Sequence, residues 1–503
     1  MKKSKMITAL LLCLALAAIF IACNDEKTNN PAAENPYGVN VTENPDGSDI
    51  TVVDMKQKVF TFLTSGWGTG TGGGNLSADI VPEDLGSDPD PILQLAYERQ
   101  IKIEQTYNVA LKQVNFEDSS GAVTQYTNSI LANDGAYDAA ITTCVYFTPL
   151  VSGNYLVDWK DILTVDMDKP YWNSNFYEAM SILGRHYAAD GDISKRRLEC
   201  VWIMAFNKTL IVENGLESPF DLVKEQRWTY DMMHEMGKEV ADDLNGDGKR
   251  RLADDLWGIN YTVDSIMGII SASGVKIAET DGGGVPVLTV GSEINLAKLD
   301  KIYATMRDNT YSVDTLFNGL VGGGVGKYAD AEIFVDGRCL FLAAATHNIM
   351  GQGGYNLRET DVDFGIIPYP KWDLTTPDYL PYTANNYHPV LTIPNTNRDL
   401  DNTGILLEAM AYEGMNTITI EFYESLLKRK TARDNASADM IDYIFGNLRY
   451  DVGLMYNLGG IGGLLGWDMS MNLRLNIVSQ IESNTPEWQH AIDVMIEEIE
   501  KNR

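Results

Sequence analysis

Residues 59–64 read VFTFLT, an apolar and β-prone run that ends in the glycine-rich loop 66–74. The segments that follow alternate between helical and strand-like patterns, in the order helix 93–107, strand 110–114, helix 123–131 and strand 137–142. Strands that alternate with helices at this spacing predict an α/β lobe with a largely parallel sheet. Ligands of such sheets bind at the carboxyl ends of the strands, so residues 65–74 and 143–148 are expected beside a binding site.

A second α/β region begins at residues 200–206, CVWIMAF, whose apolar residues are continuous, as in a strand that is covered on both faces. Further elements are predicted at 232–240, 257–261, 296–306, 339–343, 364–370 and 390–394. In the last helix, Thr485 is the expected N-cap and Pro486 the first helical residue, before an apolar stripe that begins at Trp488. The length of 503 residues and the apolar fraction of 45% fit two lobes of about 200 residues each.

The N-terminus has the pattern of an export signal. Lysines at positions 2, 3 and 5 precede the apolar run 7–22, which is short for a transmembrane helix. The run ends in a small residue and Cys23, which resembles a bacterial lipobox and implies a lipoprotein signal peptide, 1–22, with lipid on Cys23. A plain cleaved signal and a retained membrane anchor are the alternatives. Residues 23–57 are polar and rich in Asn, Pro, Asp and Glu, which predicts a flexible tether.

Charge and cysteine content exclude several classes of protein. With 39 basic and 70 acidic residues the net charge is −31, which repels the phosphates of nucleic acids. Beyond the signal and the lipidated cysteine, Cys144, Cys200 and Cys339 remain. They are odd in number and far apart, so neither a disulfide framework nor a zinc site is indicated, and we expect them to be buried.

Residues 242–255, DDLNGDGKRRLADD, place acidic or amide oxygens on alternate positions before a glycine. This is the spacing of a calcium-binding loop, because hard oxygen ligands on alternate residues can surround one Ca²⁺. We expect a structural rather than a regulatory Ca²⁺, and the alternative is a solvated acidic turn. The predicted ligands are Asp243, Asn245, Asp247, the carbonyl of Lys249, and Asp254, with Asp255 as the alternative to Asp254.

Motifs of catalysis are missing from the sequence. The glycine-rich runs 66–74 and 322–328 lack the Gly-Lys-Ser/Thr ending of a phosphate-binding loop, and residues 234–238, HEMGK, lack the second histidine of a zinc protease helix. No Gly-x-Ser-x-Gly motif is present. Composition alone does not exclude a pair of glycosidase carboxylates.

Short segments along the chain occur in a characteristic order: KPYW (169–172), LGRHY (183–187), FNK (206–208), ENGL (213–216), WTYD (228–231), FVDGRC (334–339), GIIPYPK (365–371) and RDNASADM (433–440). In this order they resemble extracellular solute-binding protein family 1, the sugar-binding lipoproteins of bacterial ABC transporters. The resemblance extends from residue 58 over nearly the whole remaining chain.

The resemblance implies the type II periplasmic-binding-protein-like fold, in which two α/β lobes are joined by a hinge. Lobe one would comprise 58–197 and 361–430, and lobe two 198–360 and 431–503. Members are also similar in carrying a DLNGDG loop away from the cleft. The implied function is that of a non-enzymatic, monomeric receptor, lipid-anchored on the extracellular face of the cell membrane. It would capture a carbohydrate, expected to be an oligosaccharide, and deliver it to the permease subunits of an ABC importer.

Sugars bind by stacking on aromatic rings and by hydrogen bonds to polar side chains. Trp67, Thr143 and Tyr146 follow predicted strands, and the other candidates lie where family members line the cleft. The predicted ligand-binding residues are Trp67, Thr143, Tyr146, His347, Tyr382, Asn385, Asn386 and Trp467. Two alternatives stay open: a cell-surface polysaccharide hydrolase, which needs two carboxylates about 5 to 9.5 Å apart, and a receptor of the same fold for a non-sugar ligand such as a peptide.

Overall fold

The computed structural model describes residues 50–66, 77–82, 85, 87, 89–262, 264–314, 331–349, 357, 360–384, 388–432, 434–472 and 474–502. All of them belong to one unit, 46–503. The strands are β1 Lys58–Ser65, β2 Val109–Phe116, β3 Ala139–Thr143, β4 Trp202–Asn207, β5 Trp257–Tyr261, β6 Ala278–Thr280, β7 Pro286–Leu288, β8 Ser312–Asp314, β9 Cys339–Ala345, β10 Phe364–Ile367 and β11 Pro389–Thr392.

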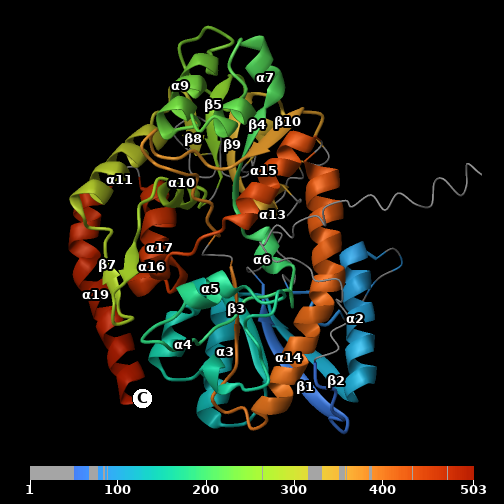
Figure 1. Ribbon diagram of the computed structural model, residues 1–503. Coiled ribbons are helices and arrows are strands. Elements are labelled where there is room, and N and C mark those ends of the chain that lie inside the picture. Colours follow the sequence, from blue (N-terminus) through green and yellow to red (C-terminus); the bar gives the residue numbers. More distant parts are fainter. Residues whose placement is uncertain are drawn as a thin grey trace, which may run out of the picture. The chain divides into compact units, whose positions relative to one another are not determined.

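Helices surround these strands (Figure 1). They are α2 Pro91–Tyr107, α3 Ser119–Ala132, α4 Thr148–Ser152, α5 Ser174–Ala179, α6 Arg196–Glu199, α7 Lys208–Glu213, α8 Pro219–Lys224, α9 Tyr230–Val240, α10 Ile266–Ala272, α11 Glu293–Met306, α12 Glu332–Val335, α13 Thr346–Ile349, α14 Leu400–Gly414, α15 Asn435–Gly446, α16 Val452–Met455, α17 Ile461–Gly463, α18 Met469–Met471 and α19 Ile477–Lys501. π-Helical segments follow α14, at Met415–Thr419 and Glu421–Thr431, and α17, at Leu464–Asp468.

The first sheet has the strand order β11-β3-β1-β2. Strand β1 is parallel to β2 and β3, and β11 is antiparallel to β3, so the prediction of a largely parallel sheet is confirmed. Phe60 and Phe62 of β1 are buried in one apolar cluster and Leu63 in another, which is why the strand is apolar throughout. The carboxyl ends of β1, β2 and β3 therefore meet at one edge of the sheet.

The second sheet has the order β10-β4-β9-β5-β8, with β4 antiparallel to both of its neighbours and β5 parallel to β9 and β8. Every residue of β4 and β9 is buried. The predicted assignment of 361–430 to lobe one is wrong at its start, because β10 pairs with β4 in the second sheet. The sheet to which β10 belongs is determined by its hydrogen bonds to a strand about 160 residues earlier in the chain. The local sequence of β10 does not indicate this pairing. The chain returns to the first sheet only between β10 and β11.

Crossing segments join the two sheets. The first, 190–201, connects the first sheet to β4, and it pairs with the return segment through the bridge between Val201 and Thr383. The N–H of Ala384 donates to the carbonyl of Cys200 at 2.7 Å. A further crossing is α14, which packs on α2 and continues through its π-helical extension towards α15 (Figure 1).

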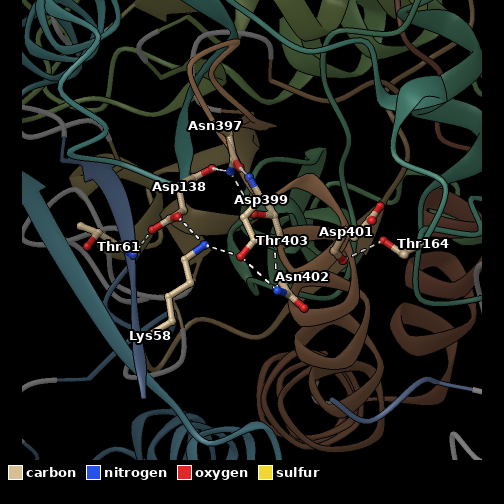
Figure 2. Close-up of polar contacts among 9 residues, drawn as sticks. All are labelled: Lys58, Thr61, Asp138, Thr164, Asn397, Asp399, Asp401, Asn402 and Thr403. Carbon is tan, nitrogen blue, oxygen red and sulfur yellow. Dashed lines mark hydrogen bonds and ion pairs between the residues drawn. The ribbon is translucent and has the colours of Figure 1, made fainter. Parts of the chain in front are cut away.

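Polar contacts hold the start of α14 against the first sheet (Figure 2). They lie at the amino ends of the parallel strands, opposite the carboxyl ends. Lys58 Nζ lies 3.1 Å from Asp138 Oδ1 and 3.3 Å from Asp399 Oδ2, which joins the start of β1 to the residues before β3 and α14. The side chain of Asn397 donates to the carbonyl of Asp138 at 3.0 Å and to the hydroxyl of Thr403 at 2.9 Å. The start of α14 is therefore bound to lobe one, and the rest of the helix crosses towards the second sheet.

Two sequence predictions fail at the ends of the chain. The tether was expected to reach residue 57, but Met55 is buried and its N–H donates to the carbonyl of Tyr107, because three apolar side chains of 50–55 pack on lobe one. The last helix begins at Ile477 with Asn476 as its N-cap, and Pro486 lies inside it. The apolar stripe extends back through Ile477, and this burial outweighs the interruption by proline. No helix in the described ranges is both long and apolar enough to span a bilayer.

Candidate ligand-binding site

A small cavity lies at the carboxyl ends of β1 and β3, where the sheet topology places a binding site. The predicted residue Thr143 is one of its lining residues. The others are Ser65, Ser77, Ile141, Thr142, Arg196 and Pro389. The hydroxyls of Thr142 and Thr143 are both buried, and neither has a hydrogen-bond partner among the described residues. The cavity is referred to below as the hydroxyl cavity.

Arg196, the charged residue that lines the hydroxyl cavity, belongs to a cluster of buried charges on the first crossing segment. Arg196 Nη1 lies 3.1 Å from Glu199 Oε2, and Lys195 pairs with the other oxygen of the same carboxylate. Burial raises the pKa of Glu199, but the two cations outweigh it and hold the pKa below its ordinary value. The carboxylate of Asp79 accepts hydrogen bonds from Ser194 Oγ at 3.1 Å and from the N–H of Lys195 at 2.8 Å. The segment is thus fixed in place by ion pairs that are shielded from water.

A second group of buried charges ties the same segment to α2 and to the π-helical extension of α14. Asp192 pairs with Arg197 and accepts from Thr419 Oγ1 at 2.6 Å, while burial raises its pKa. Arg99 of α2 donates to the carbonyl of Ile193 at 2.8 Å and lies against the carbonyl of Asp79. Burial lowers the pKa of Arg99 to about 10, so the guanidinium stays charged at neutral pH.

The two opposed crossing segments are also linked by a histidine. His388 Nε2 lies 3.3 Å from Asp190 Oδ2, and both side chains are buried. The other ring nitrogen lies 2.8 Å from Thr383 Oγ1, and Asn173 donates to Asp190 at 2.9 Å. Sequence inspection missed this whole cluster, because a run of alternating charges such as 190–199 is typical of a solvated loop.

His347, a predicted ligand residue, lies at the start of α13, at the carboxyl end of β9. Its Nδ1 is 3.3 Å from the carbonyl of Glu199, so the structure places it beside the first crossing segment. Burial and the charge of Arg196 lower its pKa to about 3. The imidazole is therefore neutral at physiological pH and contributes hydrogen-bonding atoms without charge.

Tyr146 and Tyr382 differ in their exposure. Tyr146 follows β3 and is 36% exposed, so its ring can contact a ligand. Tyr382 is buried, its carbonyl accepts from the N–H of Trp202 at 3.1 Å, and burial raises the pKa of its hydroxyl. Tyr382 therefore helps to hold the two crossing segments together. Trp67, Asn385 and Asn386 lie outside the described residues, as does Cys23.

Trp467 is 47% exposed and lies in the π-helical segment Leu464–Asp468. This segment is held by Tyr303, whose hydroxyl donates to the carbonyl of Leu465, and by Arg307, which donates to the carbonyl of Met469 at 2.9 Å. A Cβ on the neighbouring Gly466 would lie 2.7 Å from Asp264 Oδ1. The π-helical segment is thus packed, at Gly466, against the carboxylate of Asp264.

Asp264 was not predicted from the sequence. It is buried, follows β5, and has a φ of +60°, which is unusual for a residue other than glycine. Strained backbone of this kind is concentrated at functional sites. No local motif marks it, because its role depends on the loop that carries Trp467, two hundred residues later in the chain.

The predicted calcium loop is a sequence of tight turns with Gly246 at φ +70° and Gly248 at φ +77°. The two oxygens of Asp243 accept from the N–H groups of these glycines at 2.9 and 2.7 Å. Asn245 accepts from the N–H of Asp247 at 3.0 Å. The oxygens of Asp243 and Asn245 therefore accept hydrogen bonds from the backbone of the loop itself.

The two candidate carboxylates at the end of the loop differ in burial. Asp254 is exposed, whereas Asp255 is buried and accepts from the N–H groups of Leu244, at 3.1 Å, and Arg251, at 2.6 Å. Asp247 pairs with the side chain of Arg251, which lowers its pKa. Within the described ranges, no group of three acidic, histidine or cysteine side chains is arranged to hold a metal ion. The ligand types suit calcium, but Asp247 would have to leave Arg251 to bind it.

A larger cavity, of about 330 Å³, lies elsewhere on lobe one. Residues of the N-terminal segment 50–51 contribute to it, with Tyr171 and Glu408 on the opposite side. Glu408 is already hydrogen-bonded to Tyr171, at 2.7 Å, and to Trp172, at 2.8 Å. Because this cavity is away from the carboxyl ends of both sheets, we assign the ligand site to the smaller one.

No family model matches the chain, and no curated protein matches it in sequence. Solved structures match it along most of its length. An ABC substrate-binding protein from Listeria monocytogenes in complex with cycloalternan has a TM-score of 0.53 at 12% identity, over 88% of this chain and 99% of that one. An ABC transporter solute-binding protein from Thermotoga lettingae TMO, bound with α-D-tagatose, has a TM-score of 0.52 at 12% identity, over 87% and 100%.

UgpB from Mycobacterium tuberculosis, in complex with glycerophosphocholine, is similar with a TM-score of 0.55 at 17% identity, over 80% of this chain and 95% of that one. At these identities the comparison establishes the fold, and the expected fold class is confirmed. The chain has the two-lobed α/β fold of the substrate-binding proteins of ABC transporters.

Proposed function

We propose that the protein is the carbohydrate-binding component of an ABC importer, without catalytic activity of its own. The observation that carries the proposal is the exposed indole of Trp467, held on a braced π-helical segment. An exposed aromatic ring is suited to a sugar, because the ring stacks on the C–H groups of the sugar. The similar proteins bound to cycloalternan and α-D-tagatose support this ligand class.

The proposed ligand is an oligosaccharide that lies between the lobes. Thr143 and Tyr146 would contact it from lobe one, and His347 and Trp467 from lobe two. Trp67, Asn385 and Asn386 remain part of the proposal on sequence grounds. Closure of the two lobes would bury the sugar and present the closed form to the permease subunits.

Lipid anchoring through Cys23 on the extracellular face of the membrane, by a monomeric protein, is part of the same proposal. It rests on the lipobox-like sequence and the polar residues that follow it. The mass of the N-terminal peptide from the membrane-bound protein tests it. An unmodified cysteine there, or an intact signal segment, would remove the anchor.

A hydrolase is less well supported. A glycosidase needs a general acid whose pKa is raised above its ordinary value. Beside the hydroxyl cavity, ion pairs instead lower the pKa of Glu199, and Asp79 is held by hydrogen bonds from the protein itself. These carboxylates serve to fix the crossing segment.

Replacing Trp467 by alanine is expected to weaken sugar binding at least tenfold, because a stacking surface is lost while the fold is kept. Titration calorimetry with a panel of neutral and acidic oligosaccharides measures this, and incubation with the same panel shows whether products form. Tyr97→Ala, which removes a 38% exposed ring from α2, is the matched control and should bind like the wild type. Turnover of a glycan, or no binding of any sugar by the wild type, would refute the proposal.

We also propose a structural Ca²⁺ in the loop 242–255, with the ligands predicted from the sequence. The side chains of Asp243, Asn245 and Asp247 already accept hydrogen bonds from backbone N–H groups of the loop, and an ion would replace the pairing of Asp247 with Arg251. At a hundredfold excess over its Kd, Ca²⁺ would stabilise the protein by about 2.7 kcal/mol.

Calorimetric melting with Ca²⁺, with Mg²⁺ and with a chelator tests this proposal. We expect Ca²⁺ to raise the Tm, Asp243→Asn to abolish the increase, and the distant Asp439→Asn to preserve it. Asp254→Asn shows whether Asp254 or Asp255 is the last ligand. If Asp255 binds the ion, the increase in Tm with Ca²⁺ should remain in this variant. Equal melting with and without chelator in the wild type would exclude the ion.

A further inference from the structure

Two exposed aromatic residues of the proposed site are carried by segments that are far apart in the sequence. Tyr146 ends the 3₁₀ turn Cys144–Tyr146, directly after β3, and is 36% exposed. Trp467 lies in the π-helical segment Leu464–Asp468 and is 47% exposed. The distance between the two rings is therefore set by tertiary contacts and not by the local sequence.

One side chain joins the two segments. Nδ2 of Asn457 donates a hydrogen bond to the carbonyl of Val145 at 3.1 Å. Oδ1 of the same side chain accepts a hydrogen bond from the N–H of Gly462 at 2.9 Å. Val145 immediately precedes Tyr146, and Gly462 lies just before the π-helical segment. A single amide group thus contacts both of the segments that carry the aromatic rings.

The chain around Asn457 passes from one lobe to the other. Leu458 is buried in the apolar cluster that contains Leu63 of β1. Ile461 and Leu465 are buried in the cluster that contains residues of β4 and β9. The helices α16 and α17, which flank Asn457, lie between the two sheets (Figure 1). Asn457 therefore lies where a change in its contacts would act on both lobes.

An asparagine is suited to this position for two reasons. The carbonyl of Val145 needs a donor and the N–H of Gly462 needs an acceptor, and a side-chain amide offers one of each. An aspartate could accept from Gly462, but it could not donate to Val145. The backbone of Asn457 is also left-handed, with φ +44° and ψ +49°, a conformation that asparagine adopts more readily than most residues.

Both ends of the bridge are held firmly. On lobe one, the hydroxyl of Thr148 donates to the carbonyl of Tyr456, whose own hydroxyl donates to the carbonyl of Met180 at 2.7 Å. On lobe two, Tyr303 and Arg307 hold the π-helical segment at its carbonyls. The amide of Asn457 therefore connects two segments that are each braced by their own lobe.

The connection between the rings is short. Gly462 and Trp467 are five residues apart, which is at most about 8 Å along a helix. The path from Tyr146 to Trp467 through Asn457 thus consists of two hydrogen bonds and fewer than two helical turns. A site in which two rings contact one ligand requires their spacing to be fixed by supporting hydrogen bonds of this kind.

We propose that Asn457 is a positioning residue of the sugar site, whose amide sets the spacing of the Tyr146 and Trp467 rings so that one oligosaccharide contacts both. The inference rests on the proposed function and deepens it, because it makes the site selective for ligands of two or more sugar units. A monosaccharide can contact only one of the rings, so it gains nothing from their spacing.

Titration calorimetry of the full chain tests this selectivity, with the oligosaccharide panel described above and the monosaccharides of which those sugars are built. We expect the wild type to bind an oligosaccharide at least tenfold more tightly than its monosaccharide. Asn457→Gly keeps the left-handed backbone and removes both hydrogen bonds. It should weaken oligosaccharide binding about tenfold and monosaccharide binding less than twofold.

Asn133→Gly is the matched control. Asn133 is exposed at the end of α3 and is also left-handed, with φ +52°, but it bridges no ligand-binding segments. This variant should bind like the wild type. Asn457→Asp keeps the acceptor for Gly462 and loses the donor for Val145, so it should weaken oligosaccharide binding as well. It also keeps the test decisive if Asn457→Gly does not fold.

A double variant separates positioning from a general effect on the fold. In Trp467→Ala the spacing of the rings no longer matters, so adding Asn457→Gly should weaken binding by less than twofold more. The loss of stability caused by Asn457→Gly should be the same in both backgrounds. Independent losses of affinity, about tenfold from each substitution, would show that Asn457 does not act through the ring.

A spectroscopic measurement tests the bridge without any ligand. The chain is labelled with 5-fluorotryptophan, and the ¹⁹F resonance of Trp467 is identified by its loss in Trp467→Phe. This resonance should shift or broaden in Asn457→Gly and stay unchanged in Asn133→Gly. An unchanged resonance in Asn457→Gly would contradict the positioning role, whatever the protein binds.

The outcomes distinguish this inference from the proposed function. If the wild type binds oligosaccharides and both Asn457 variants bind them equally well, the positioning role is wrong and carbohydrate binding stands. If the wild type binds no sugar but Asn457→Gly changes the Trp467 resonance, the bridge exists and the proposed function is wrong, together with the role of Asn457 in sugar binding. If neither sugar binding nor the change in resonance is observed, both are wrong.

Discussion

Replacing Gly414 by alanine is expected to lower the free energy of unfolding by about 3 kcal/mol, a large effect for a single methyl group. A Cβ at this position would lie 1.9 Å from the carbonyl oxygen of Asp192 and 3.1 Å from Arg99 Nη1. Both neighbours are buried and the first is backbone, so the end of α14 would have to move away from the crossing segment. The contact of Thr419 with Asp192 would then be lost as well.

Urea unfolding followed by tryptophan fluorescence measures this loss. Gly463→Ala is the matched control, because no atom lies within 4 Å of a Cβ there, and its stability should be unchanged or slightly higher. We also expect Gly414→Ala to weaken ligand binding, since the displaced segment carries Arg196. If the two alanine variants unfold at the same urea concentration, the close approach of α14 to the crossing segment is incorrect.

Asp451→Ala is expected to cost about 3 kcal/mol, through the loss of a helix cap and of a contact between distant segments. The buried carboxylate accepts from the N–H groups of Gly453, at 2.8 Å, and Leu454, at 3.1 Å, at the start of α16. It also accepts from the N–H of Ile277 at 2.8 Å, next to β6. Alanine would leave these three buried donors without their acceptor.

The effect should depend on pH. Burial raises the pKa of Asp451 to about 6, more than the backbone hydrogen bonds lower it. Because the pKa is higher in the folded state, binding of a proton to Asp451 stabilises the folded protein. This stabilisation is complete below the unfolded pKa of about 3.8 and is lost as the pH rises through 6. The difference in stability between wild type and Asp451→Ala should therefore be larger at pH 4 than at pH 7.5.

Unfolding in urea at several pH values checks this dependence, with the exposed Asp439→Ala as control. That variant should stay within about 0.5 kcal/mol of the wild type at each pH. A difference for Asp451→Ala that is constant from pH 4 to 7.5 would show that the carboxylate does not titrate in this range.

The sequence predicted the individual elements well, because their apolar patterns are local. The run VFTFLT is β1, the continuous apolar residues 202–206 lie in β4, and the helices at α2, α3 and α11 lie where their periodicity indicates. Cys144, Cys200 and Cys339 are buried, as expected. Each of these predictions depends only on burial of nearby side chains.

Properties that depend on distant partners were not predictable. The membership of β10 in the second sheet follows from its pairing with β4, a strand far earlier in the chain. Thr143 could be placed from its position after β3. The burial of Arg196 could not be predicted, because a run of charged residues is expected to be exposed to solvent. Only the tertiary structure shows that this run is buried.

The buried ion pairs of the first crossing segment have a consequence for the entropy of ligand capture. Binding between two bodies that move freely has to remove their relative motion, and that cost reduces affinity. Here Arg99 and Thr419 fasten the segment to α2 and to the continuation of α14, and His388 fastens it to the return strand. Much of this order is therefore present before a ligand arrives, so a larger part of the contact energy is left to discriminate between ligands.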